Sequence, residues 1–302
     1  MGNGPSVGAM LEIKGLTRRF GDKTAVDHVS FPVPDGGLTG FVGGNGAGKT
    51  TTMRMVMGVL QAHDGEVLWD GTPITAAERR RIGYMPEERG LYPKQAIADQ
   101  LVYLASLRGM DPGAARAAVM ELLERFGLAE RAKDHVEKLS LGNQQRVQII
   151  AALVPQPDAL ILDEPFSGLD PTAVDSMAGL LREHTSRGVP VLFSSHQLDL
   201  VDRLCDRLVI MAQGKVVTQG TAEELRAGGP VRYELVTAGD AGWVRDLPGI
   251  HVADVDGRTA LLEVVESGAE QRVLEQAIRR GPVEEFRRVV PRLSEIYQEA
   301  TS

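Results

Sequence analysis

Residues 43–50 read Gly-Gly-Asn-Gly-Ala-Gly-Lys-Thr, which matches the pattern G-x-x-x-x-G-K-[ST]. The glycines let the backbone curl so that several N–H groups point at one chain of phosphates. In this pattern Lys49 can reach the β- and γ-phosphates, and the Thr50 hydroxyl can bind Mg²⁺. The apolar run 38–42 suits a buried strand, and residues 51–60 suit a helix whose N-terminus faces the phosphates. The stretch therefore predicts a strand, a phosphate-binding loop and a helix, in that order.

The composition is that of a folded protein without a basic surface. The chain has 302 residues, 43% hydrophobic and 25% charged, with a net charge of −8. This length suggests two domains, and the acidic balance argues against a nucleic-acid partner. Cys205 is the single cysteine, which excludes an intrachain disulfide and favours a cytoplasmic location. No apolar run approaches the roughly 18 residues that a membrane-spanning helix needs.

The order of strand-like and helix-like segments predicts an α/β domain with a helical insertion. Residues 1–9 are rich in Gly, Pro and Ser, and we expect them to form a flexible tail. Residues 10–228 are expected to form the first domain, and their pattern becomes helical from about residue 94 to residue 155. Elsewhere strands alternate with helices, which implies a mainly parallel sheet covered by helices.

A second, smaller domain is expected at residues 229–302, after the turn Gly228-Gly229-Pro230. Its pattern reads strand, helix, hairpin, helix, strand and a final helix, with Asp256-Gly257 as the hairpin turn. The order βαββαβ fits a small α+β sandwich of the ferredoxin-like kind.

Two acids end another apolar strand, because Asp163 and Glu164 directly follow the run 159–162. A carboxylate at the carboxyl end of a parallel strand faces the same crevice as the phosphate loop. Asp163 is therefore expected to hold Mg²⁺, directly or through water, and Glu164 to orient and polarise the attacking water.

Because these motifs occur in the order typical of the family, the chain resembles an ATP-binding cassette (ABC) ATPase subunit over about residues 10–225. Leu139-Ser140-Leu141-Gly142-Asn143 resembles the family signature, in which Leu141 replaces the usual glycine and Asn143 the usual glutamine. The resemblance implies ATP as the bound nucleotide, Mg²⁺ as its metal, and a homodimer with ATP sandwiched at its interface. Ser140 and Gly142 would then touch the γ-phosphate of the ATP that the other subunit binds, since Ser140 begins a helix whose positive end faces the anion.

Three further positions match the family pattern or depart from it. His196, after a strand, matches the histidine that binds the γ-phosphate and supports Glu164. Phe20 matches the aromatic side chain that stacks on adenine. Glu87 stands where the family usually has a glutamine near Mg²⁺, and its carboxylate can still ligate the metal. The residues predicted in this way are Glu164, His196 and Lys49 for catalysis; Thr50, Asp163 and Glu87 for the metal; and Phe20, Gly43, Asn45, Gly46, Ala47, Gly48, Lys49, Thr50, Thr51, Ser140, Gly142 and Asn143 for the nucleotide.

One cassette with no membrane-spanning run suits a subunit that drives a separate transmembrane permease. The chain would then be cytoplasmic and held at the inner face of the cell membrane by that permease. The small C-terminal domain resembles that of ATPases from drug, sodium-ion or glycan exporters, which favours an exporter. An ATP-dependent clamp or regulatory module of the same family, without a transport partner, stays open as the alternative. A permease that co-purifies with the chain would decide between the two.

Overall fold

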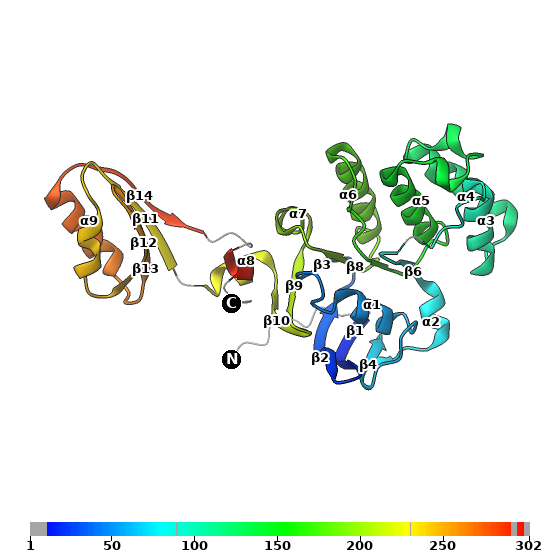
Figure 1. Cartoon of the computed structure of the whole chain (residues 1–302), viewed down its shortest axis with the longest axis horizontal. Coiled ribbons are helices and arrows are strands. Elements are labelled where there is room, and N and C mark those ends of the chain that lie inside the picture. The colour runs from blue at the N-terminus through cyan, green and yellow to red at the C-terminus, as the bar shows by residue number, and fades with distance from the viewer. Residues whose placement is uncertain (1–10, 89, 230, 291–294, 299–302) are drawn as a thin grey trace. The chain divides into compact units, whose positions relative to one another are not determined.

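The computed structural model describes residues 11–88, 90–229, 231–290 and 295–298 (Figure 1). The chain divides into two compact units, Met1–Thr221 and Ala222–Ser302. The short helix α8 (Ala222–Ala227) belongs to the second of these units, whereas the second domain was expected from residue 229. The expected flexible tail at residues 1–9 lies outside the described residues.

The first unit is built on a six-stranded sheet with the order β10-β9-β3-β8-β7-β6. The strands from β9 to β6 are parallel, and only β10 pairs in the antiparallel sense, which confirms the expected α/β fold. Strands β3, β7 and β8 are buried along their whole length, as apolar strands inside a parallel sheet must be. The strands are β3 (Leu38–Val42), β6 (Ile82–Met85), β7 (Ala159–Leu162), β8 (Val191–Ser195), β9 (Arg207–Ala212) and β10 (Lys215–Gly220).

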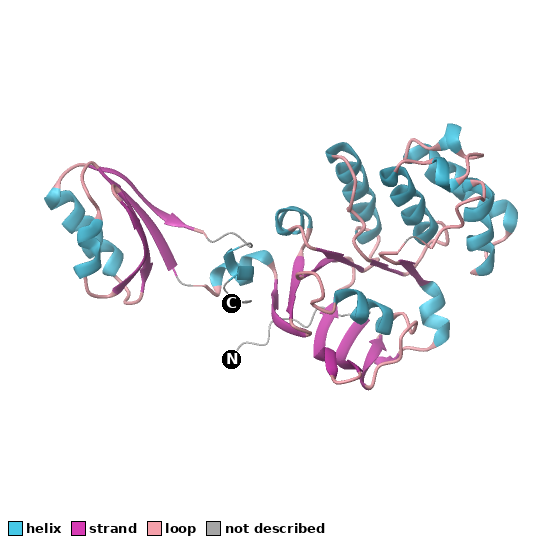
Figure 2. Cartoon of the chain, viewed as in Figure 1, coloured by secondary structure: helices cyan, strands magenta, loops and turns pink. Residues whose placement is uncertain are grey.

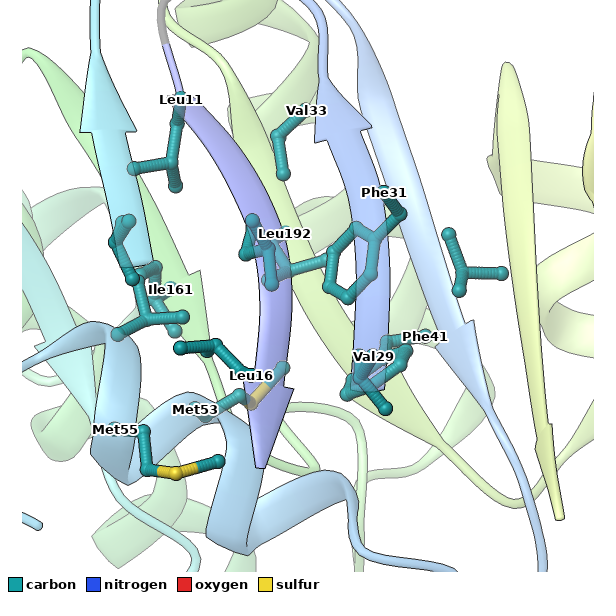
Figure 3. Close-up of a cluster of buried hydrophobic side chains, with 14 of the residues drawn as sticks. Leu11, Leu16, Val29, Phe31, Val33, Phe41, Met53, Met55, Ile161 and Leu192 are labelled. Carbon is teal, nitrogen blue, oxygen red and sulfur yellow. The ribbon is translucent and has the colours of Figure 1, made fainter. Parts of the chain in front are cut away.

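A second, antiparallel sheet packs over this one with the order β2-β1-β4-β5. Helix α1 (Lys49–Val56) contributes Met53 and Met55 to the same hydrophobic cluster as side chains of both sheets (Figure 3). The cluster therefore fixes the start of α1, and with it the loop at residues 43–48. The strands of this sheet are β1 (Leu11–Phe20), β2 (Lys23–Val33), β4 (Asp64–Trp69) and β5 (Thr72–Pro73). Figure 3 also labels Leu11, Leu16, Val29, Phe31, Val33, Phe41, Ile161 and Leu192.

The predicted helical insertion follows β6 and contains three α-helices. Asp111 caps the second of them, because its side chain accepts hydrogen bonds from Gly113 N and Ala114 N at 2.9 and 3.0 Å. None of the helices in the described part of the chain has the length and hydrophobicity needed to span a membrane. The helices of the first unit are α2 (Ala76–Arg81), α3 (Ile97–Leu107), α4 (Pro112–Arg125), α5 (Leu141–Leu153), α6 (Pro171–Thr185) and α7 (Leu198–Leu204), with 3₁₀ turns at Ala129–Arg131 and Val136–Lys138.

The second unit contains a four-stranded antiparallel sheet with the order β12-β13-β11-β14. Figure 2 shows a helix beside this sheet. The order of its elements agrees with the ferredoxin-like expectation, but the first expected helix is only the 3₁₀ turn η3, whose five residues are too few for an amphipathic α-helix. Residues 295–298 are helical, and the rest of the expected final helix lies outside the described residues. The elements that follow α8 in this unit are β11 (Val231–Thr237), η3 (Gly242–Asp246), β12 (Ile250–Asp256), β13 (Thr259–Val264), α9 (Ala269–Arg280) and β14 (Val283–Val289).

Candidate functional site

The loop between β3 and α1 needs its glycines for space and for backbone conformation. Gly48 has φ 107°, and a Cβ atom there would lie 2.7 Å from the carbonyl oxygen of Ala25. Lys49, the first residue of α1, is only 7% exposed. Its Nζ donates to the carbonyl oxygens of Gly43 at 2.6 Å and Gly44 at 3.3 Å, so the ammonium group lies inside the curl of the loop. A curl of this kind, with a cation inside it, is an anion-binding site.

Asp163 follows β7 and is fully buried. The Ser194 hydroxyl donates to its Oδ1 at 2.5 Å, whereas Oδ2 has no hydrogen-bond partner among the described residues. Burial raises the pKa of the Asp163 carboxyl, and the Ser194 hydrogen bond opposes that rise. A buried carboxylate with an open oxygen is costly unless a cation approaches it. The orphaned Oδ2 therefore fits a bound metal ion.

Two more oxygen donors that could bind a metal ion lie at the start of α1 and in the loop after β6. Thr50 Oγ1 donates to Glu87 Oε2 at 3.2 Å. With Asp163 they supply one hydroxyl and two carboxylates, the hard oxygen donors that Mg²⁺ prefers. Within the described ranges, no group of three or more His, Cys, Asp or Glu side chains could hold a metal ion by itself. This partial donor set fits Mg²⁺, which in nucleotide sites takes one or two carboxylates and completes its shell with phosphate and water.

Glu164 follows Asp163 directly, and Ser194, His196 and Lys49 all lie close to it. Its backbone has φ 53°, a left-handed conformation that is rare for glutamate. Its N–H donates to Ser194 Oγ at 2.8 Å, and its carboxylate lies 3.0 Å from His196 Nδ1 and 3.9 Å from Lys49 Nζ. Backbone strain of this kind persists only where the surroundings impose it, and it gathers at functional sites.

Lys49, Thr50, Glu87 and Glu164 border a cleft of about 470 Å³, a size typical of small-molecule sites. Asp163 and His196 do not line this cleft themselves, and they contact residues around it through Ser194 and Glu164. Two residues that the sequence did not single out, Lys23 and Ala25, also line it, and Lys23 pairs with Phe20 across the β1–β2 turn. The lining residues are Phe20, Lys23, Ala25, Asn45, Gly46, Ala47, Gly48, Lys49, Thr50, Thr51, Glu87 and Glu164. The structure thus gathers most of the predicted nucleotide set around one cleft.

Phe20 presents a half-exposed ring to the cleft. The Arg18 guanidinium lies over that ring, 4.8 Å from its centroid, and Arg18 Nη1 donates to the carbonyl oxygen of Gln61 at 2.8 Å. Arg18 does not line the cleft, so it supports the ring from outside. The contacts of Arg18 could not be predicted from the sequence, because its hydrogen-bond partner Gln61 lies far away along the chain.

The signature residues lie at the N-terminus of α5 and do not line the cleft. Ser140 is exposed and caps the helix, since its Oγ accepts from Asn143 N at 3.4 Å. Leu141, in the place of the usual family glycine, is 61% exposed. Ser140, Gly142 and Asn143 are therefore available to a ligand held by another molecule and not to one in this chain's own cleft.

Comparisons with known proteins agree with this geometry. The sequence model of the family "ABC transporter" matches residues 26–167, and that of the "ATP-binding protein DrrA1-3-like, C-terminal domain" matches residues 220–301. The chain is 40% identical over 294 residues to the uncharacterized ABC transporter ATP-binding protein YhaQ of Bacillus subtilis, covering 96% of this chain and 98% of that protein.

Two other relatives have names that mention a process. The linearmycin resistance ATP-binding protein LnrL of Bacillus subtilis is 35% identical over 235 residues, 76% of each chain. The Nod factor export ATP-binding protein I of Burkholderia orbicola is 36% identical over 220 residues, 72% of each chain.

Solved structures show the same likeness in three dimensions. The ATP-binding subunit of an ABC transporter superposes with a TM-score of 0.68 at 31% identity, over 72% of this chain and 92% of that one. The cbiO1 protein of Clostridium perfringens, described as part of the ABC transporter complex cbiONQ, gives a TM-score of 0.63 at 28% identity, over 73% and 92% of the two chains.

Proposed function

Since the chain belongs to the family of ABC transporter ATP-binding proteins, we propose that it hydrolyses ATP in the cleft beside Lys49 and thereby drives a separate membrane permease. The observation that carries the proposal is the position of the Glu164 carboxylate, 3.9 Å from Lys49 Nζ and 3.0 Å from His196 Nδ1. An acid held this close to the phosphate-binding lysine can act on a water molecule that attacks the γ-phosphate.

Each side chain of the cleft has a distinct part in this reaction. The loop N–H groups and Lys49 hold the phosphates and offset the negative charge that builds up on the transferred group. Glu164 orients the attacking water and accepts its proton, and His196 keeps the carboxylate in place. Mg²⁺, when bound by Asp163 and its neighbours, would neutralise charge on the phosphate oxygens.

The same geometry supports a homodimer as the active form. Ser140 and Gly142 lie outside this chain's own cleft, on the exposed N-terminus of α5. A helix N-terminus carries partial positive charge and free N–H groups, so it binds anions. In a head-to-tail pair, each signature would meet the γ-phosphate in the cleft of the partner subunit, with ATP between the two.

Two findings support an exporter. The relatives LnrL and Nod factor export protein I are named for resistance and for export. The C-terminal unit matches the DrrA1-3-like domain along nearly its whole length, from residue 220 to residue 301. On this proposal the chain is cytoplasmic and joins the membrane through its permease.

Glu164→Gln tests the reaction and the dimer together. We expect the variant to bind ATP and to lose about 10²–10⁴-fold in turnover, the range attributed to a positioned acid or base. Because ATP then stays intact, the protein should elute as a dimer in size-exclusion chromatography with ATP and as a monomer without it. Lys49→Ala serves as the comparison, since it should bind ATP poorly and form no such dimer. Normal hydrolysis by Glu164→Gln would assign the reaction to another group.

The permease is tested with the same variant. Tagged Glu164→Gln, with ATP present, should retain a protein with several membrane-spanning segments when captured from detergent-solubilised membranes of its own cell. Identification of such a protein by mass spectrometry, and its loss when ATP is omitted, would support transport. Capture of soluble proteins alone would favour the clamp or regulatory module.

A further inference from the structure

Helix α5, which begins after Ser140, buries two glutamines. Gln145 and Gln148 are 6% and 4% exposed, and they lie one helical turn apart. Glutamine is seldom buried to this degree, because its amide must find hydrogen-bond partners away from water. The hydrogen-bond partners of the two amides therefore indicate what Gln145 and Gln148 do in the structure.

Gln148 holds the loop that bears Glu87. Its Nε2 lies 3.4 Å from the carbonyl oxygens of Pro86 and Glu88, so its two acceptors flank Glu87 on either side. Helix α5 packs beside β6, the strand that leads into this loop (Figure 1). A shift of Gln148 would therefore move the main chain on both sides of Glu87.

Gln145 contacts the other acid of the site in the same way. Its Nε2 donates to the carbonyl oxygen of Glu164 at 2.9 Å and to that of Pro165 at 3.2 Å. Glu164 has the strained backbone described above, so a hydrogen bond to its own carbonyl helps to hold that conformation. One face of α5 thus holds the main chain at both acids.

The Gln148 amide is not explained by packing. Its Oε1 is buried without a hydrogen-bond partner among the described residues. Methionine would fill a similar volume and leave no such acceptor unpaired. By contrast, the buried Gln100 uses both ends of its amide, because Oε1 accepts from Tyr92 N at 2.8 Å and Nε2 donates to Tyr92 O at 3.2 Å. Gln148 therefore buries an unpaired oxygen, which costs free energy, and its amide contacts only the carbonyl oxygens of Pro86 and Glu88 on either side of Glu87.

We propose that Gln148 and Gln145 are positioning residues, which hold Glu87 against the Thr50 hydroxyl and Glu164 in the cleft. This inference rests on the proposed ATPase function. Neither glutamine lines the cleft, so both act through the acids. Gln148 would act on the 3.2 Å hydrogen bond between Thr50 Oγ1 and Glu87 Oε2. A displacement of the Glu87 carboxylate by well under 1 Å would break this hydrogen bond.

Gln148→Met tests the first half of the proposal by equilibrium binding. The affinity for ATP is measured once with Mg²⁺ and once with EDTA. We expect the variant to bind Mg·ATP about tenfold more weakly, the lower end of the effect of removing a group that orients a metal ligand. Binding of metal-free ATP should stay unchanged, because the phosphate loop is intact.

Gln100→Met is the matched control. It removes a buried amide from a neighbouring helix, and that amide holds the same connection at Tyr92 instead of beside Glu87. It should leave the Mg²⁺ dependence of binding as in the wild type. An equal loss in Gln100→Met would show that general loosening of the loop, and not the placement of Glu87, explains the effect, and would overturn the proposal.

A double-mutant cycle adds a readout that a purely structural role would not move. In a Glu87→Ala background, Gln148→Met should have no further effect on the affinity for Mg·ATP, because the ligand that it positions is gone. Additive losses would overturn the proposal. If Gln148→Met does not fold, Gln148→Asn replaces it, since its amide is too short by one methylene to reach the two carbonyl oxygens.

Gln145→Met tests the second half. Because Glu164 acts on water and not on the nucleotide, kcat should fall about tenfold with KM for ATP unchanged. A change in KM alone would overturn this half. If the wild-type chain binds no ATP, the proposed function itself is wrong. If the wild type binds Mg·ATP and the Gln148→Met variant shows the same Mg²⁺ dependence of binding, only this inference is wrong.

Discussion

The carboxyl group of Asp163 is fully buried, and its Oδ2 has no hydrogen-bond partner among the described residues. Asp163→Asn removes the charge and retains the shape. In the absence of nucleotide and Mg²⁺ we expect the variant to be the more stable protein at pH 7, by about 2–4 °C in Tm, the shift that about 1 kcal/mol produces in a domain of this size. Thermal unfolding followed by circular dichroism measures the difference.

The sign of this effect follows from the raised pKa of Asp163. Because burial raises that pKa above its ordinary value of 3.8, the folded chain resists ionisation. Stability from this group is present in acid and is lost as pH rises through the folded pKa, so the advantage of Asn should vanish toward about pH 4. Wild type should also gain more than the variant when Mg·ATP is added. A variant that is less stable than wild type at pH 7 without ligand would contradict this account.

Arg18 lies over the ring of Phe20, on which the family resemblance predicts that adenine stacks. Arg18→Met should raise KM for ATP about two- to fivefold with little change in kcat, because a cation over an exposed aromatic ring contributes about 0.5–1 kcal/mol and fixes the orientation of the ring. Binding of inorganic triphosphate, which has no base, should not change. Arg19→Met is the control, since the neighbouring side chain is exposed. An equal effect on triphosphate and on ATP would place the defect in the phosphate loop.

Sequence alone could predict the positions of residues that belong to local motifs. Lys49 and Thr50 belong to one short motif, and Asp163 and Glu164 follow a strand whose end must face that motif. Arg18 could not be found in this way, because its partner Gln61 lies 43 positions away along the chain. The same holds for Gln148, whose acceptors lie 62 and 60 positions away. Such pairs arise only when the chain folds.

At the scale of elements, α5 joins the exposed signature to the buried glutamines. Ser140→Asp tests the signature without disturbing the helix, because Asp is as good an N-cap as Ser. It places a negative charge where the partner subunit's γ-phosphate would lie. Combined with Glu164→Gln, it should abolish the ATP-dependent dimer in size-exclusion chromatography. The matched control is Ser176→Asp, an exposed position inside α6.

The measurement that separates interface from cleft is ATP binding by the monomer. Ser140→Asp should keep the affinity of the wild-type monomer, because Ser140 does not line the chain's own cleft. A monomer that fails to bind ATP would mean that the signature acts within one chain. A stable ATP-bound dimer despite the added charge would remove Ser140 from the interface.

Elements long enough to show a clear helical or strand period of apolar residues could be predicted from the sequence, and shorter elements could not. The helical insertion was expected at about residues 94–155, where α3, α4 and α5 lie, and the parallel sheet followed from the alternation of strands and helices. The helix expected after β11 is the five-residue turn η3, because so short a segment shows no helical period. That β1, β2 and β4 form one antiparallel sheet depends on pairing between β1 and a strand that lies beyond α1.

At the scale of the whole molecule, the two units have separate hydrophobic cores. The cluster of the first unit lies between Leu11 and Met211, and that of the second between Leu235 and Ala277. Every residue that lines the cleft comes from positions 20–164. Units that each bury their own core are expected to fold independently. The C-terminal unit is therefore proposed to affect the dimer or the permease and to take no part in the chemistry.

A chain that ends at Thr221 tests this division of roles. We expect it to fold, with the helical circular-dichroism signal of the first unit, and to bind Mg·ATP within about twofold of the full chain, because no cleft residue is removed. Glu164→Gln in the shortened chain should still form an ATP-dependent dimer if the signature and the cleft suffice. A folded chain that binds ATP but does not dimerise would assign the C-terminal unit to the dimer contact. A folded chain that binds no ATP would show that the second unit supplies part of the nucleotide site, and would refute the proposed separation.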